Sequence, residues 1–126
     1  MNMMNTLARD AYARPDAPAR NARAVEYELF VRMTRALSAA WAQRKQNHSA
    51  LVTALYDNGK MWRTLAVDVA DIGNELPSAL RAQLFYLYEF TTEHSRKVLD
   101  GTASAEVLVE INTAVMRGLR GGGASV

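Results

Sequence analysis

The chain of 126 residues contains no cysteine, only three prolines and only seven glycines. The lack of cysteine excludes disulfides and thiolate metal sites. No apolar run approaches the roughly 18 residues that suggest a membrane-spanning helix, and the N-terminus lacks the continuous apolar core of a signal peptide. We therefore expect a cytoplasmic protein that does not enter a membrane.

Positive and negative residues nearly balance, since the formal net charge is only +2. Residues 1–45 carry eight Lys or Arg against four Asp or Glu, whereas residues 46–126 carry seven against nine. A dedicated nucleic-acid binder normally has a dense basic stripe. This mild excess, interleaved with acidic residues, argues against direct binding to nucleic acid.

The residues that are abundant favour helix. The apolar fraction of 49% is too high for a disordered chain, and the common residues include the helix formers Ala, Leu, Arg and Glu. Apolar residues recur at the three- and four-residue spacing of a helix. The sequence therefore predicts an all-α fold, a compact bundle of four main helices plus a short N-terminal helix at about 4–13. The first main helix starts near Pro18 or Asn21 and runs to about residue 44, and the others lie at about 47–71, 77–99 and 105–119. We expect one helical domain over residues 1–120 and a flexible C-terminal tail over 121–126.

The third predicted helix combines a clear apolar stripe with an internal glycine. Its expected inward residues are Leu51, Leu55, Trp62, Leu65, Val69 and Ile72. Asn58 and Gly59 are typical of a hairpin turn, but their flanks keep the helical period, so we place both inside the helix. Gly59 costs about 1 kcal/mol there relative to alanine. Close approach of a neighbouring backbone would explain this glycine.

The stretch GNELPSALRAQLF, residues 73–85, predicts a tight joint between the third and fourth helices. Gly73 suits a left-handed C-terminal cap, and Asn74 is suited to an Asx turn. Pro77 fits the first turn of the next helix, where its missing N–H is harmless. The expected N-caps of the third and fifth helices are Asn47 or Ser49 and Ser104.

No set of residues has the pattern of an active site. The two histidines, His48 and His94, lack a metal-binding spacing. Glu89 and Glu93 lie on an outward helix face, where solvated carboxylates are routine. No glycine-rich phosphate loop follows a strand. We therefore expect a protein that is not an enzyme, with no catalytic, cofactor-binding or metal-binding residue.

The candidate binding residues in the helices each allow two interpretations. Asn58 lies near the middle of an apolar stripe, so its amide needs partners. Either the loop backbone at 74–76 supplies them, or the amide is presented to a partner's helix. Trp62 is either a core residue or an interface anchor. Tyr86 is expected to be exposed, and surplus apolar surface on the second and fourth helices suggests a site for another helix.

Several short motifs occur in a fixed order along the chain. They are AYAR at 11–14, EYELF at 26–30, ALYDNGKMWRTLAVDVAD at 54–71, NELPSALRAQL at 74–84 and LVEINTAVMRGL at 108–119. The Asn-x-Leu-Pro-x-x-Leu-Arg-Ala junction and the Ile-Asn pair are the most specific of them. In these motifs and in the gaps between them, the sequence resembles the FlaF family of flagellar biosynthesis regulators, found in flagellated alphaproteobacteria.

The resemblance implies a cytoplasmic protein that supports flagellin production and its export through the flagellar type III apparatus. It also implies chaperone-like binding of flagellin and cooperation with the FlbT regulator, which acts on flagellin mRNA. The alternative is a post-transcriptional role on that mRNA, direct or as a partner of FlbT. On this hypothesis Trp62, Phe85 and Tyr86 are candidate apolar contacts. The residues expected to set or flank the geometry are Asn58, Arg81 and Asn112.

Overall fold

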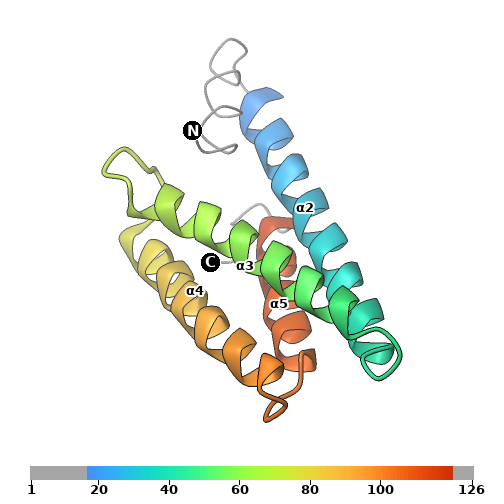
Figure 1. Ribbon diagram of the computed structural model, residues 1–126. Coiled ribbons are helices and arrows are strands. Elements are labelled where there is room, and N and C mark those ends of the chain that lie inside the picture. Colours follow the sequence, from blue (N-terminus) through green and yellow to red (C-terminus); the bar gives the residue numbers. More distant parts are fainter. Residues whose placement is uncertain (1–16, 121–126) are drawn as a thin grey trace.

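The computed structural model describes the backbone of residues 17–120 and the side chains of residues 27–118. Four helices make up this part of the chain (Figure 1): α2 (Ala17–Ala42), α3 (His48–Ala70), α4 (Ser78–Leu99) and α5 (Glu106–Arg120). The predicted all-α class with four main helices is therefore confirmed. The short helix expected at 4–13 and the tail expected at 121–126 lie outside the described residues.

The helices form a bundle in which α3 lies between α2 and α4. α2 packs against α3 and α5, and α4 packs mainly against α3. The contact between α4 and α5 is short, since these helices diverge from the loop that joins them (Figure 1). Within residues 17–120, the backbones of α2 and α4 are not in contact, and neither are those of α3 and α5. α4 is consequently packed against the rest of the bundle almost entirely through α3.

Two apolar clusters form the core. The first consists of Leu37, Ala40, Leu51, Ala54, Leu55, Val98, Ala105 and Leu108. The second consists of Phe30, Met61, Trp62, Leu65 and Val69. Five of the six residues in the predicted stripe of α3 are buried. The sixth was predicted wrongly: Ile72 is 97% exposed because the helix ends at Ala70 and the chain turns outward.

The joint between α3 and α4 depends on Asn74. Its Oδ1 accepts a hydrogen bond from Leu76 N at 3.0 Å, which confirms the predicted Asx turn, and its Nδ2 donates to Asp68 O at 3.0 Å. The left-handed cap predicted at Gly73 is wrong, because Asp71 ends α3 in an extended conformation. The only described glycine with positive φ is Gly101, at 79°. The Asn74 amide binds a terminal carbonyl, so the chain needs no left-handed residue here.

The predicted N-caps are present at the starts of α3 and α5. Asn47 Oδ1 accepts hydrogen bonds from Ala50 N at 3.1 Å and from the Ser49 hydroxyl at 3.0 Å. Ser104 Oγ accepts from Glu106 N at 3.0 Å. Pro77 occupies the N-cap position of α4, directly before the first helical residue.

Replacing the α3 cap tests the energy of this local contact. The substitution Asn47→Ala removes the acceptor for Ala50 N, and we expect it to lower the free energy of unfolding by about 1 kcal/mol. Urea unfolding followed by circular dichroism measures the change. Asn47→Asp keeps an acceptor oxygen and should remain close to the original stability. Equal stability of the alanine and original proteins would contradict the assignment.

Burial at the end of α3 perturbs one carboxyl group. Asp68 is half-buried, and its pKa is raised above the usual aspartate range, first by burial and then by the nearby Asp71 carboxylate. The folded protein therefore holds a proton on Asp68 more tightly than the unfolded chain does. This carboxyl contributes stability below its unfolded-state pKa, and the contribution is lost as the pH rises through the folded-state pKa.

The substitution Asp68→Asn should remove the free-energy cost of burying a charged carboxylate at this position. At neutral pH the asparagine avoids burying a charge beside Asp71, so the variant should have a higher free energy of unfolding than the original protein. The difference should shrink as the pH falls through the pKa of Asp68. Urea unfolding at a series of pH values measures both effects. A variant that is less stable at neutral pH would show that the carboxylate is favourable there.

Candidate functional site

Three side chains predicted for the site form one hydrogen-bonded chain in the core. Trp62 Nε1 donates to Asn112 Oδ1 at 2.9 Å, and Asn112 Nδ2 donates to Asn58 Oδ1 at 2.8 Å. All three residues are completely buried. We refer to Asn58, Trp62 and Asn112 as the polar core triad.

The polar core triad links two helices that are not neighbours in the bundle. Asn58 and Trp62 are four residues apart, so they lie on the same face of α3. Asn112 reaches them from α5, across the interior. The partner expected for Asn58, the loop backbone at 74–76, was therefore wrong. The Asn74 side chain makes the hydrogen bonds of that loop, to Asp68 O and from Leu76 N. Helix packing brings Asn112 to Asn58 instead.

Trp62 also anchors the second apolar cluster. Its ring meets the ring of Phe30 edge-on, with centroids 5.7 Å apart and planes at 87°. This geometry is favourable for an aromatic pair. With its N–H bonded and its ring enclosed, Trp62 corresponds to the core interpretation and presents no surface to a partner.

Buried polar atoms of both the triad and α4 remain without partners. Asn58 Nδ2 and Thr91 Oγ1 are buried and make no hydrogen bond within the described part of the chain. Of the 22 residues in α4, only Thr91 and Val98 are buried. Unpaired buried polar atoms cost free energy, so α4 is held less firmly than α3.

The predicted residues of α4 lie at or near the surface. Arg81 is half-buried, and its Nε atom has no hydrogen-bond partner. Phe85 is 38% exposed and Tyr86 is 63% exposed. Phe85 packs edge-on against Tyr88, with centroids 5.7 Å apart. Phe85 and Tyr86 are consecutive, so they point about 100° apart around the helix axis.

Exposed apolar side chains gather on α3 and α4. On α4 they are Phe85, Tyr86, Phe90 and Leu99, and on α3 they are Val52, Tyr56 and Val67. The surplus expected on the fourth helix is thus present. The surplus expected on the second helix is not, because residues 27–42 of α2 leave no large apolar side chain exposed. Tyr56 and Val52 were missed, although both fall outside the inward stripe of α3.

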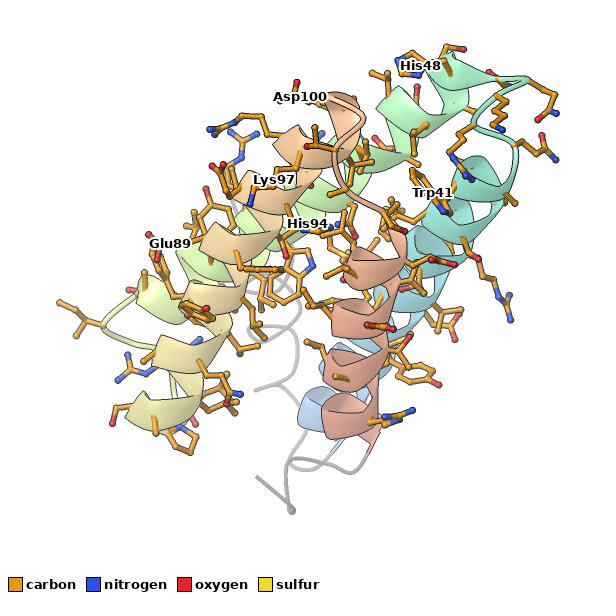
Figure 2. All side chains as sticks on the ribbon, turned by 90° about the horizontal axis from the view of Figure 1, so that it is seen from below. Trp41, His48, Glu89, His94, Lys97 and Asp100 are labelled. Carbon is orange, nitrogen blue, oxygen red and sulfur yellow. The ribbon has the colours of Figure 1, made fainter. Side chains whose placement is uncertain are left out.

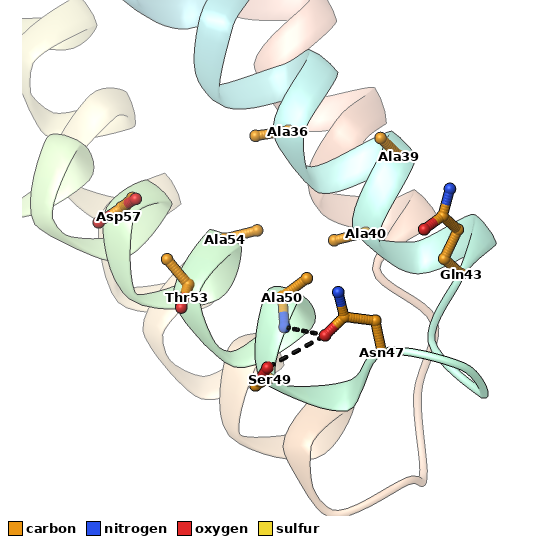
Figure 3. Close-up of a pocket in the computed structure, with 10 residues that line it drawn as sticks. All are labelled: Ala36, Ala39, Ala40, Gln43, Asn47, Ser49, Ala50, Thr53, Ala54 and Asp57. Atoms are coloured by element: carbon orange, nitrogen blue, oxygen red, sulfur yellow. Dashed lines mark hydrogen bonds between the residues drawn. The ribbon is translucent and has the colours of Figure 1, made fainter.

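A shallow hollow lies between α2 and α3 (Figure 3). It has a volume of about 440 Å³ and is lined by Ala36, Ala39, Ala40, Gln43, Asn47, Ser49, Ala50, Thr53, Ala54 and Asp57. Its walls are mostly alanine methyl groups, and Asp57 is its only ionisable residue. The Ser49 hydroxyl in this lining donates to Asn47 Oδ1 at 3.0 Å and not to Asp57.

The two histidines have different surroundings. His94 Nε2 lies 2.8 Å from Ser104 O, so this ring connects α4 to the loop before α5 (Figure 2). The ring also stacks on Phe90, with centroids 5.5 Å apart. His48 is exposed at the start of α3. Among the described residues, no group of three or more His, Asp or Glu is arranged to hold a metal ion.

The described helices define the class of protein: an all-α bundle with a buried polar triad and apolar side chains exposed on two adjacent helices. None of these helices is both long and apolar enough to cross a membrane. The family model for flagellar protein FlaF matches residues 8–119, and the chain therefore belongs to the FlaF family. Comparison with curated proteins and with solved structures gives no match.

Disrupting the polar core triad should destabilise the whole bundle. Asn112→Leu leaves Trp62 Nε1–H and Asn58 Oδ1 buried without partners. Each unpaired group costs about 1–3 kcal/mol, so we expect the free energy of unfolding to fall by at least about 2 kcal/mol in urea titrations. Combining Asn112→Leu with Asn58→Leu and Trp62→Phe should restore part of the loss. Unchanged stability of the single variant would contradict this role.

Proposed function

We propose that this FlaF-family protein binds flagellin in a chaperone-like way in the cytoplasm. In this role it supports flagellin synthesis and export through the flagellar type III secretion apparatus, and it is not an enzyme. Family membership supplies the flagellar context. The observation that carries the proposal is the set of apolar side chains exposed on α3 and α4.

The physical requirement follows from the nature of the cargo. The terminal segments of flagellin are amphipathic and polymerise as helices, so their apolar stripes must be covered before export. A helical surface suits this task because the guest helix satisfies its own main-chain hydrogen bonds, and only its apolar stripe needs a partner. The cargo must also be released. Micromolar affinity, about −8 kcal/mol, meets both needs.

In this proposal, surface residues contact flagellin and buried residues hold the helices in position. Phe85 and Tyr86 are exposed on α4 and serve as apolar contacts. The polar core triad lies beneath and sets the position of α3 against α5, so its contribution to binding is indirect. Arg81, half-buried beside the exposed residues, supplies a cation for an acidic group on the guest.

Binding to flagellin is tested by copurification. The protein should copurify with full-length flagellin and should lose it when the terminal helices of flagellin are removed. Phe85→Ala should weaken the complex by about tenfold, since truncating an aromatic contact typically costs more than 1 kcal/mol. Calorimetry with purified proteins measures the affinity. Absence of binding at tens of micromolar would contradict the proposal.

The same preparations separate the alternative, a role on flagellin mRNA either directly or with FlbT. A gel shift with the flagellin leader RNA at physiological salt tests direct binding. A purely electrostatic complex loses affinity steeply as the salt concentration rises. Capture of FlbT from cells that lack flagellin would instead favour a role as a partner of that regulator.

A further inference from the structure

Nothing in the described part of the chain explains Gly59. It lies well within α3, where glycine is less favourable than alanine. Positive φ does not require it, because the only described glycine in that region is Gly101. A neighbouring backbone does not require it either, since no atom lies within 4 Å of the position that a Cβ would take. The close neighbour expected from the sequence is therefore absent from the residues that the structure describes.

Gly59 belongs to a stripe on the side of α3 that borders α4. Val52, Tyr56, Gly59 and Arg63 follow the i, i+4, i+7, i+11 spacing of one helix side. The opposite side of α3, which includes Ala54, lines the hollow against α2 (Figure 3). Because α3 lies between α2 and α4 (Figure 1), the stripe with Gly59 runs along the α4 edge.

α4 contributes a matching stripe to the same surface. Arg81, Phe85, Tyr88 and Leu99 lie on one side of this helix by the same spacing rule. His94 lies on its other side, where it bonds to the loop before α5 (Figure 2). The stripe with Phe85 therefore faces away from α5 and borders α3. We call the two stripes together, Val52, Tyr56, Gly59, Arg63, Arg81, Phe85, Tyr88 and Leu99, the α3–α4 outer face.

The α3–α4 outer face is both apolar and positively charged. Val52, Tyr56, Phe85 and Leu99 are exposed on it. Neither Arg63 nor Arg81 makes an ion pair within the described residues, and Arg81 Nε is buried without a hydrogen-bond partner.

The nearest acidic side chain of α4, Glu89, lies one turn beyond Phe85 and two turns beyond Arg81. Glu89 is exposed there, and Glu93 is already paired with Arg96, at 3.2 Å. Since neither Arg63 nor Arg81 is paired with a carboxylate within the described residues, both guanidinium groups are open to carboxylates of a guest.

We infer that the α3–α4 outer face binds an amphipathic helix whose apolar stripe is flanked by carboxylates. The guest's apolar residues cover Val52, Tyr56 and Phe85, and its carboxylates reach Arg63 and Arg81. The missing side chain at Gly59 lets the guest backbone come close to α3. This inference rests on the proposed function in that flagellin's terminal helices are the natural guests, and it adds the place and the charge of the contact.

A pair of designed helical peptides tests the inference. Both carry the same apolar stripe, flanked by glutamates in one peptide and by lysines in the other. Fluorescence anisotropy with the full chain should give micromolar affinity for the glutamate peptide and at least about tenfold weaker binding of the lysine peptide. Arg81→Glu, which leaves Arg63 in place, should abolish this preference. Equal binding of both peptides to the original protein would overturn the charge assignment.

The substitution Gly59→Ala separates binding from folding. Alanine is the better helix former, so the variant should melt a few degrees higher than the original protein. Its added methyl group lies in the path of the guest backbone and should weaken the glutamate peptide by at least about tenfold. Gly118→Ala is the matched control: Gly118 lies in α5 and also has no atom within 4 Å of its Cβ position. This control should keep full affinity.

The remaining outcomes distinguish the two proposals. Flagellin binding that survives Gly59→Ala would overturn the α3–α4 outer face and leave the proposed function standing. Glutamate-peptide binding that is lost in Gly59→Ala, without any flagellin binding, would support the face and overturn the proposed function. Sedimentation showing a dimer of this chain that Gly59→Ala dissociates would overturn the assignment to a foreign helix, because a second copy would be the occupant.

Discussion

The fold depends on one buried chain of hydrogen bonds, from Trp62 through Asn112 to Asn58. It joins α3 to α5 across the interior, although the backbones of these helices do not touch within the described residues. Apolar packing alone tolerates small rotations and shifts of a helix. A buried amide bonded on both sides does not, because any shift leaves polar atoms without partners. The triad therefore fixes how α3 and α5 face each other.

α2 and α4 differ in how much they bury against α3 and α5. α2 packs along both α3 and α5 and encloses Phe30 against Trp62. α4 rests mainly on α3, buries two side chains and leaves buried polar atoms unpaired along the seam. Its apolar surplus remains at the surface. Such a helix suits the proposed contact with a partner, and the buried triad holds α3 and α5 in one geometry.

Much of the fold and part of the candidate site followed from sequence patterns. The helices, the Asn47 and Ser104 caps and the Asx turn at Asn74 all follow from contacts within a few residues. The errors lie where several local solutions compete. Gly73 was suited to a left-handed cap, but the Asn74 side chain reached the carbonyl of Asp68 instead. Ile72 has the residue spacing of the α3 stripe, but α3 ends at Ala70, so the Ile72 side chain is exposed.

The sequence by itself determined which segments are helical, where they begin and that the chain belongs to the FlaF family. Tertiary structure alone decided that Asn58 pairs with Asn112 and that Trp62 is enclosed. The physical reason is the separation along the chain over which each interaction acts. Capping and periodicity are set by neighbours along the chain, whereas the partner of a buried amide is set by helix packing across some 50 residues.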